Sequence, residues 1–365
     1  MTAQIIAAGR SPIVPRGGAF ASLQIEALAE PVIQAVLKRA GILSHQVEEL
    51  ILSNALGGGG NPARRVALAA GLPQRVAGLS IDRQCAGGMD ALLLAKMMVE
   101  SGTAEVVVAG GVESFSRRPL RAHTFSDGRP PEPYDQAPFT PWPERDPDMA
   151  EAAETLAKRL GISRQDQDAW AVRSHANALA HADTTGEIIP LQGIIEDPFT
   201  RRLSLGVCKR AAVLTGDITA ANAAVAADGV AFCVVVSPRV ARGRNGLLIQ
   251  GGTTCGDVPD CPGLAPVAAI KEALAKHHLK SGDLKACEIM EAYAVQAIAC
   301  IEGAGLDYVR VNQGGGALAR GHPIGASGAV NVVRLFHTLM QTGGTGLAAI
   351  AAAGGIATAL VLAQS

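Results

Sequence analysis

Apolar positions along the chain follow two different periods. Short runs of valine, isoleucine and alanine are typical of buried strands, whereas apolar residues that recur every three or four positions are typical of helices on a core. The first pattern predicts strands over residues 4–8, 47–52, 105–108, 231–236, 286–290 and 347–352. The second predicts helices over residues 23–40, 63–70, 91–99, 149–160, 164–182, 267–277, 294–301 and 329–340. Strands and helices that alternate in this way indicate the α/β class.

Two stretches of the chain lack either period. Residues 117–147 are polar and rich in proline, and residues 186–212 are irregular. In a compact domain, a loop as long as the first is usually a lid over a site, an oligomer contact or a mobile segment. The sequence leaves these three interpretations open.

One order of features occurs twice along the chain. Cys85-Ala-Gly-Gly88 precedes an apolar helix and then a strand that runs into Gly110-Gly111. His322-Pro-Ile-Gly325 likewise precedes an apolar helix and then a strand that reaches Gly354-Gly355. Two halves of similar order suggest a pseudo-twofold arrangement in which both helix N-termini point at one shared site. Cys85 and His322 then occupy corresponding positions in the two halves.

Cys85 stands where a helix N-terminus is expected. Because residues 91–99 are apolar on almost every side, this helix should be buried. Unpaired N–H groups and the positive end of the helix dipole stabilise a thiolate at such a position. Gly87 and Gly88 would let a substrate approach the backbone. This stretch alone fits both a nucleophilic cysteine and an ordinary buried one.

The stretch 321–328, Gly-His-Pro-Ile-Gly-Ala-Ser-Gly, is too specific for a generic loop. Between Gly321 and Pro323 the backbone of His322 is fixed and its ring is aimed. Together with Cys85, this imidazole suits acyl-thioester chemistry, in which a thiolate attacks the carbonyl and the imidazole donates a hydrogen bond to the oxyanion.

Composition excludes several other classes of function. A formal net charge of −1 gives no basic surface for nucleic acid or an anionic membrane. Seven cysteines without a CxxC pair argue against a disulfide framework or a zinc site and favour a reducing compartment. The N-terminus lacks the pattern of a signal peptide, and the apolar run 346–363 is interrupted by Gly-Gly as in core strands. We therefore expect a cytoplasmic protein with neither a metal site nor a membrane span.

Motifs spread over nearly the whole chain resemble those of the thiolase family. They are Asn61-Pro-Ala-Arg64, Arg83-Gln-Cys-Ala-Gly-Gly88, Ala109-Gly-Gly-Val-Glu-Ser114, Thr219-Ala-Ala-Asn222, Glu291-Ala-Tyr-Ala294, Asn312-Gln-Gly-Gly-Gly316 and the stretch 321–328. The resemblance implies a five-layered α/β/α/β/α fold with pseudo-twofold halves, residues 1–230 and 231–365, and a loop domain at about 117–212. It also implies a homodimer or tetramer, with a hetero-complex as a further option.

The resemblance implies roles for particular residues. In thiolases the counterpart of Cys85 is acylated by an acyl-CoA, and the counterpart of His322 activates that cysteine and binds the thioester oxygen of the second substrate. The backbone N–H groups of Cys85 and Ala353 would form an oxyanion hole. The implied substrate is an acyl-CoA or an acyl-carrier thioester, and no separate cofactor is implied.

Two catalytic positions of the family are replaced. Thiolases carry the asparagine of an Asn-Glu-Ala-Phe motif, which holds a water in one oxyanion hole, where this chain has Met290. A thioether is only a weak acceptor and cannot hold that water as an amide does. Thiolases carry a second cysteine, the acid and base on the α-carbon, where this chain has Ala351. No side chain at 351 can take the proton that a Claisen condensation removes.

The expected CoA path also differs from the family. A histidine near the pantetheine becomes Asp148, beside Met149, and a serine becomes Ala224, whereas Arg210 matches a family arginine near the CoA phosphates. We expect these four residues to border bound CoA. Three arginines that flank the insertion either meet CoA phosphates or form a solvated surface: Arg117, Arg118 and Arg121.

These observations favour an acyltransferase of the thiolase type with impaired Claisen and thiolysis chemistry. It would load an acyl group on Cys85 and pass it to an acceptor that is acidic, loses CO₂ or is deprotonated by another group. Loss of a general acid/base typically costs about 10²–10⁴-fold in rate. One alternative is a conventional acetyl-CoA C-acyltransferase whose base is replaced by Glu291 or Cys287. The other is a non-catalytic scaffold or partner subunit.

Overall fold

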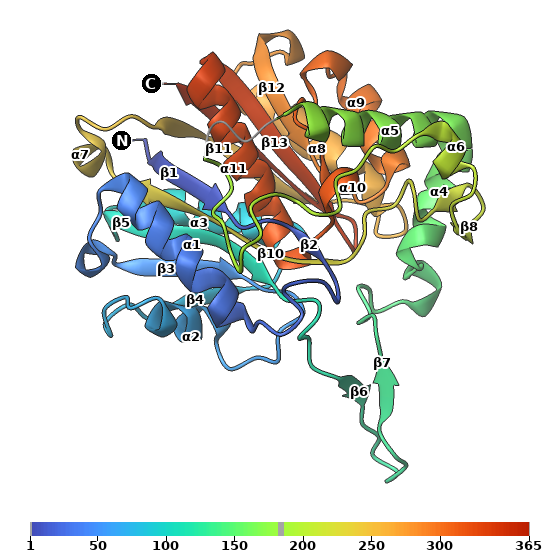
Figure 1. Ribbon diagram of the computed structural model, residues 1–365, viewed down its shortest axis with the longest axis horizontal. Helices are drawn as coiled ribbons and strands as arrows, with labels where there is room; N and C mark the ends of the chain where they lie inside the picture. Colours follow the sequence, from blue (N-terminus) through green and yellow to red (C-terminus); the bar gives the residue numbers. More distant parts are fainter. Residues whose placement is uncertain (1, 182–185, 365) are drawn as a thin grey trace.

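A computed structural model describes residues 2–181 and 186–364. Within them, ten strands form one mixed sheet in the order β12-β13-β14-β11-β1-β10-β5-β3-β4, with β2 paired to β10 (Figure 1). The strands are β1 Gln4–Arg10, β2 Val14–Pro15, β3 Glu49–Ser53, β4 Leu79–Ile81, β5 Val106–Glu113, β10 Ala227–Val236, β11 Leu247–Gly256, β12 Leu284–Ile289, β13 Thr345–Ala352 and β14 Ile356–Gln364. Neighbours pair antiparallel except β3 with β4, β3 with β5 and β12 with β13.

Helices cover the two halves of this sheet and also lie between them. Helices α1 (Ile25–Ala40) and α2 (Pro62–Ala69) pack on strands of the N-terminal half, and α8 (Ala265–Lys276) packs on strands of the C-terminal half beside α9 (Ala294–Ala304). Helices α3 (Gly87–Glu100) and α11 (Ile324–Thr342) contact each other and strands of both halves. Three separate hydrophobic clusters fill the spaces between these layers. The five-layered α/β/α/β/α arrangement is confirmed.

Glycines let the two central helices approach closely where they cross. A Cβ at Gly88 would lie 2.7 Å from the backbone nitrogen of Ala329, and a Cβ at Gly328 would lie 2.6 Å from that of Met89. A Cβ at Gly87 would lie 2.2 Å from Ser53 Oγ. The backbone contacts exclude any larger residue at Gly88 and Gly328, and a side chain at Gly87 would have to displace the hydroxyl of Ser53. The prediction that these glycines make room for substrate is therefore wrong, because protein atoms occupy that space.

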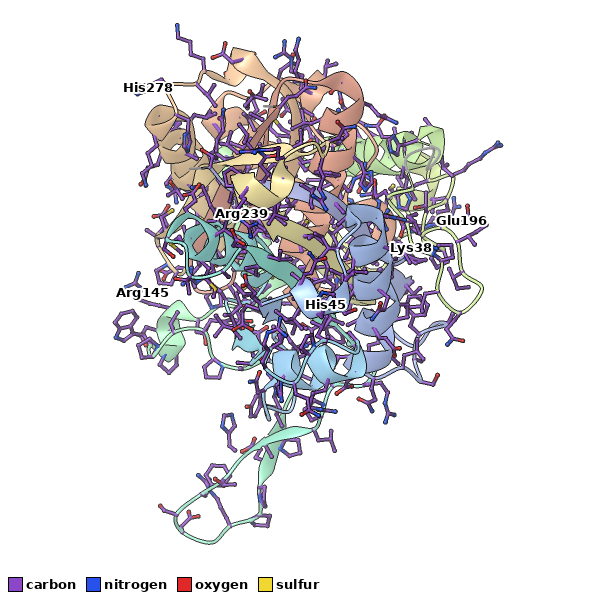
Figure 2. The ribbon with its side chains drawn as sticks, turned by 90° about the vertical axis from the view of Figure 1, so that its left-hand side faces the viewer. Lys38, His45, Arg145, Glu196, Arg239 and His278 are labelled. Carbon is purple, nitrogen blue, oxygen red and sulfur yellow. The ribbon has the colours of Figure 1, made fainter. Side chains whose placement is uncertain are left out.

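Within the described residues, the segment between β5 and β10 contributes no strand to the main sheet. It contains β6 (Arg121–His123), β7 (Glu132–Tyr134), α4 (Met149–Leu160), α5 (Arg164–Ala180), α6 (Leu205–Cys208), β8 (Val213–Thr215) and β9 (Ile218–Thr219). The hairpin of β6 and β7 extends away from the body in both views (Figures 1 and 2). Periodicity did not predict this hairpin, because its strands are only three residues long and largely exposed.

Other differences from the predicted elements are small. Strand β11 was missed because glycines and threonines weaken its apolar pattern. Helix α3 is not buried on all sides, since Met97 is 55% exposed. Residue 230, the expected end of the first half, lies inside β10. No helix of the described residues is long and apolar enough to cross a lipid bilayer. Two further α-helices, α7 (Pro238–Ala241) and α10 (Ala317–Arg320), are as short as α6.

Candidate active site

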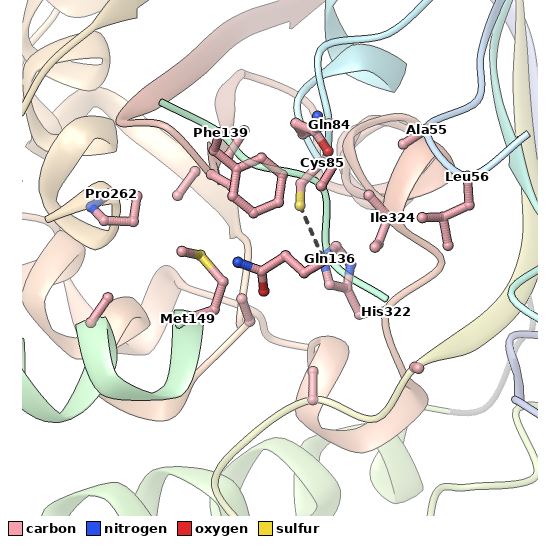
Figure 3. A pocket seen from close by; sticks show the side chains of 18 of the residues that line it. Ala55, Leu56, Gln84, Cys85, Gln136, Phe139, Met149, Pro262, His322 and Ile324 are labelled. Atoms are coloured by element: carbon pink, nitrogen blue, oxygen red, sulfur yellow. Dashed lines mark hydrogen bonds between the residues drawn. The ribbon is translucent and has the colours of Figure 1, made fainter. Parts of the chain in front are cut away.

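The structure brings Cys85 and His322 together. Cys85 precedes α3 and His322 precedes α11, and the Cys85 Sγ atom lies 3.1 Å from His322 Nε2 although the two residues are 237 positions apart (Figure 3). Gln84, just before the cysteine, has a φ of 51°, in the left-handed region that side chains rarely adopt. The carboxylate of Asp82 accepts a hydrogen bond from Gln84 N at 2.8 Å and stabilises this turn. The predicted juxtaposition of two helix N-termini at one site is thus observed.

Hydrogen bonds on the far side of the ring determine which nitrogen of His322 carries the proton. The hydroxyl of Ser327 lies 2.6 Å from Nδ1 and donates to the carbonyl of Pro323 at 3.0 Å. A hydroxyl has one proton, so Ser327 Oγ accepts from Nδ1–H. This assigns the proton of the neutral imidazole to Nδ1 and leaves Nε2 as an acceptor toward the Cys85 thiol. His322 is therefore oriented as a base for Cys85.

Burial favours the neutral form of both members of the pair. It raises the pKa of the Cys85 thiol to about 12, an effect to which the carboxylates of Glu113 and Asp82 add. Burial also lowers the pKa of His322 to about 4. The backbone N–H favours the thiolate but does not outweigh burial. Both shifts oppose the resting thiolate that the helix terminus favours.

A buried carboxylate holds the loops on both sides of the pair, and the sequence analysis assigned it no role. Glu113, only 1% exposed, accepts hydrogen bonds from Asn54 Nδ2 at 2.7 Å, Ala55 N at 3.1 Å and Gly325 N at 2.9 Å. Burial raises its pKa to about 7, although these donors favour the carboxylate. The sequence signal that could have identified Glu113 is its position at the end of a buried strand, within the Gly-Gly-Val-Glu-Ser motif.

Cys85 and His322 lie on the wall of a cavity of about 510 Å³. Figure 3 shows Pro262 and Met149 on one side of the cysteine and Ala55 and Leu56 on the other. Its wall combines small apolar residues with a few polar side chains, among them Gln84, Gln136, Tyr293 and Gln296. Such a cavity can hold an elongated substrate with the sulfur of Cys85 near its middle.

The predicted site residues divide into two groups. Ala351, Ala353, Met149 and Ala224 line the cavity together with the catalytic pair. Three others do not, namely Met290, Asp148 and Arg210. Met290 is 1% exposed and packs in the central hydrophobic cluster, whereas the Asp148 carboxylate caps α4 through Ala150 N and Glu151 N. Arg210 is exposed on the loop before β8.

The proposed substitute bases also lie outside the cavity. Glu291 is fully buried and accepts hydrogen bonds from Trp170 Nε1, Ser174 Oγ and other donors. Cys287 is 2% exposed in β12, and burial raises its pKa to about 12. Neither side chain can reach a substrate at Cys85. Within the described residues, no group of three or more His, Cys, Asp and Glu side chains is arranged to hold a metal ion.

Comparisons with known proteins agree with this geometry. Residues 3–239 match the family "Thiolase, N-terminal domain" and residues 248–364 match "Thiolase, C-terminal domain". A Staphylococcus aureus protein named "Putative acetyl-CoA C-acetyltransferase VraB" is 34% identical over 358 residues, which is 92% of each chain. A Staphylococcus haemolyticus protein of the same name is 34% identical over 375 residues, 98% of each chain.

A solved structure extends the similarity to the whole fold. The crystal structure of the Bacillus anthracis acetyl-CoA acetyltransferase superposes with a TM-score of 0.93 at 34% identity, over 100% of this chain and 99% of that one. Together with the two family matches and the paired Cys85 and His322, this shows that the chain belongs to the thiolase family.

Proposed function

We propose that this chain is an acyltransferase that forms a thioester between an acyl group and Cys85 and passes the group to an acceptor. The observation that carries the proposal is the Cys85–His322 pair, with Sγ and Nε2 3.1 Å apart, on the wall of a cavity of about 510 Å³. Membership of the thiolase family, and relatives named acetyl-CoA C-acetyltransferases, support an acyl-CoA as donor. An acyl-carrier thioester offers the same reacting bond.

The first half-reaction uses only groups that this chain has. The S–H proton of Cys85 moves to Nε2 of His322 while Sγ forms a bond to the thioester carbonyl carbon. In this proposal the N–H groups of Cys85 and Ala353, two residues that line the cavity, stabilise the oxyanion, as the thiolase resemblance implies. When the C–S bond to CoA breaks, His322 returns the proton to the departing sulfur. The products are acyl-Cys85 and free CoA.

The second half-reaction lacks the usual base. Ala351 lines the cavity but offers only a methyl group, and Glu291 and Cys287 lie outside it. The acceptor must then supply its own carbanion, because it is acidic or because it loses CO₂, or another group must deprotonate it. Its attack on the acyl carbonyl breaks the bond to the Cys85 sulfur, and the released thiolate takes up a proton from water through Nε2 of His322. We therefore propose that ordinary thiolysis is slow.

Intact-protein mass spectrometry tests the first half-reaction. Incubation with a panel of acyl-CoAs is expected to add the mass of one acyl group, and the Cys85→Ala variant is expected to show no gain. His322→Ala should lower the acylation rate by about 10²–10⁴-fold, the usual effect of losing a general base. If the folded wild type takes no acyl group from any donor, the proposal fails, and the non-catalytic scaffold becomes the better explanation.

A single substitution tests the missing base. Ala351→Cys places a thiol in the cavity and is expected to raise thiolysis of acetoacetyl-CoA by CoA at least about tenfold. Ala351→Ser is the matched control, because it places a hydroxyl oxygen where the Cys variant places its sulfur. Thiolysis by the wild type at the rate of the Cys variant would instead favour the second candidate, a conventional acetyl-CoA C-acetyltransferase, for which the names of the relatives argue.

A further inference from the structure

We propose that one end of the catalytic cavity binds a carboxylate, so that the acyl group carried by Cys85 ends in a negative charge. Three guanidinium groups line this end of the same cavity: Arg16, Arg118 and Arg121. This inference rests on the proposed acylation of Cys85 and adds the substrate class.

The arginines are held in place by an aromatic ring and by the backbone. The guanidinium carbon of Arg118 lies 4.7 Å from the centroid of the Phe115 ring, and that of Arg16 lies 5.4 Å from the same centroid. Arg121 donates a hydrogen bond from Nη2 to the carbonyl of Ala55 at 2.8 Å. Because the Arg118 side chain is only 19% exposed, its charge is partly shielded from water.

The position of the arginine end of the cavity relative to Cys85 indicates which part of the substrate it contacts. Ala55, the acceptor for Arg121, and Leu56, which lines the same pocket as all three arginines, lie on the opposite side of Cys85 from Met149 and Pro262 (Figure 3). The side with Met149 and helix α4 is where the thiolase resemblance puts the pantetheine arm. A thioester that enters from that side directs the far end of its acyl group toward the arginines.

The charge at this end is unbalanced. Among the described residues that line the cavity, the carboxylates are Asp82 and Asp135, so three guanidinium groups face two acids. Asp135 pairs with Arg118 at 2.8 Å but its side chain is 90% exposed, and such surface pairs contribute little free energy. A substrate carboxylate can displace Asp135 and accept two parallel hydrogen bonds from a guanidinium group.

The diphosphate of CoA is another anion that three arginines can bind. The arginines could bind either the carboxylate of the acyl group or the diphosphate of CoA, and a donor without the nucleotide distinguishes the two. An acyl-pantetheine has the acyl end and the thioester but lacks the nucleotide. If the enzyme still prefers an anionic acyl group when the donor is an acyl-pantetheine, the arginines bind the carboxylate of the acyl group, because this donor has no diphosphate.

The experiment compares the rate of Cys85 acylation by succinyl-CoA with that by its neutral monomethyl ester. We expect the wild type to prefer succinyl-CoA by about ten- to hundredfold, the value of one or two hydrogen bonds to a charged group. Arg118→Gln should reduce this ratio about tenfold, and Arg118→Lys should restore part of it. Arg129→Gln is the matched control, because Arg129 also lies over a phenylalanine ring, that of Phe125, but does not line the cavity.

Each outcome has a distinct meaning. A wild-type preference that falls in Arg118→Gln, with CoA and with pantetheine donors alike, supports the proposal. Equal rates for the succinyl donor and its ester in the wild type overturn it while leaving acylation of Cys85 intact. An Arg118→Gln defect shared by both CoA donors and absent with both pantetheine donors also overturns it and assigns the arginines to the CoA phosphates. No acylation by any donor refutes the proposed function itself.

Discussion

Burial penalises any state in which the Cys85 thiol or the His322 ring carries a charge before substrate arrives. The thiol therefore retains its proton, and Nε2 of His322 accepts it only as the new bond to carbon forms. Ser327 contributes by holding the proton of the ring on Nδ1. A neutral pair of this kind does not react readily with small electrophiles that need a preformed thiolate, which protects the cysteine in the absence of a thioester.

The neutral pair predicts how alkylation of Cys85 depends on pH. With a thiol pKa near 12, the thiolate fraction grows about tenfold for each pH unit below that value. Reaction with iodoacetamide should accordingly accelerate about tenfold per unit between roughly pH 6 and pH 9, without a plateau. Peptide mass spectrometry measures the rate at Cys85 separately from the half-buried Cys255 and Cys261. A rate that levels off near neutral pH would show a thiolate–imidazolium pair instead.

At the level of elements, a buried ionic network fixes the irregular segment after α5 to the core. The Glu187 carboxylate lies 2.5 Å from Arg10 Nε on β1 and 2.9 Å from Arg334 Nη1 on α11. Asp197 accepts two hydrogen bonds from Arg10 and lies 3.1 Å from Arg320 Nε. The network joins strands and helices of both halves, so the segment and the core should unfold together.

Glu187→Gln is expected to destabilise the protein by about 3–5 kcal/mol, because it removes one of the two buried carboxylates that pair with each of Arg10 and Arg334. Burial alone would raise the pKa of Glu187, but Arg334 and Arg10 outweigh it and hold that pKa well below its usual range. The stabilisation from the carboxylate is present above the unfolded-state pKa, near 4, and is lost as the pH falls below it. Urea denaturation at neutral and acidic pH measures both effects, with the exposed Glu30→Gln variant as control. An equal loss in both variants would refute the role of the network.

The sequence predicted elements and the catalytic pair better than it predicted the cavity. Glycine, helix and strand patterns are local and can be recognised in the sequence. Their repetition gave Cys85 and His322 corresponding positions in two similar halves, which predicted that the two residues meet. The family comparison located both Met290 and Ala351, but only geometry shows that Ala351 faces the cavity while Met290 lies in the core. The arginine end was assigned to CoA or to solvent because its position depends on how distant segments pack, which no local pattern encodes.

At the level of the whole molecule, one edge of the sheet predicts the oligomeric state. Strand β4 ends the sheet beyond β3, and Leu79 on it is 41% exposed. The neighbouring face of α3 exposes Met97, at 55%. An apolar edge strand beside exposed side chains invites pairing with a second copy. We propose that this edge forms the homodimer that the family resemblance implies.

Sedimentation velocity should therefore show a dimer. Leu79→Lys combined with Met97→Lys should shift it to the monomer, because two buried lysines per protomer would face their copies across the interface. Leu179→Lys is the control, since Leu179 is 50% exposed and lies on α5, a helix that packs against α9 and α10. A dimer that survives the double substitution would place the interface elsewhere.

The place of β1 in the sheet has a consequence for synthesis of the chain. This first strand joins the two halves, since its neighbours are β10 and β11, which begin at Ala227 and Leu247. At about 5–20 residues per second, translation needs roughly 10–40 s after completing β1 to reach β10. During that interval an apolar strand has neither neighbour and is open to wrong pairing or to a chaperone. The strand that joins the two halves of the sheet is thus synthesised first but forms its hydrogen bonds only after β10 and β11 have been made.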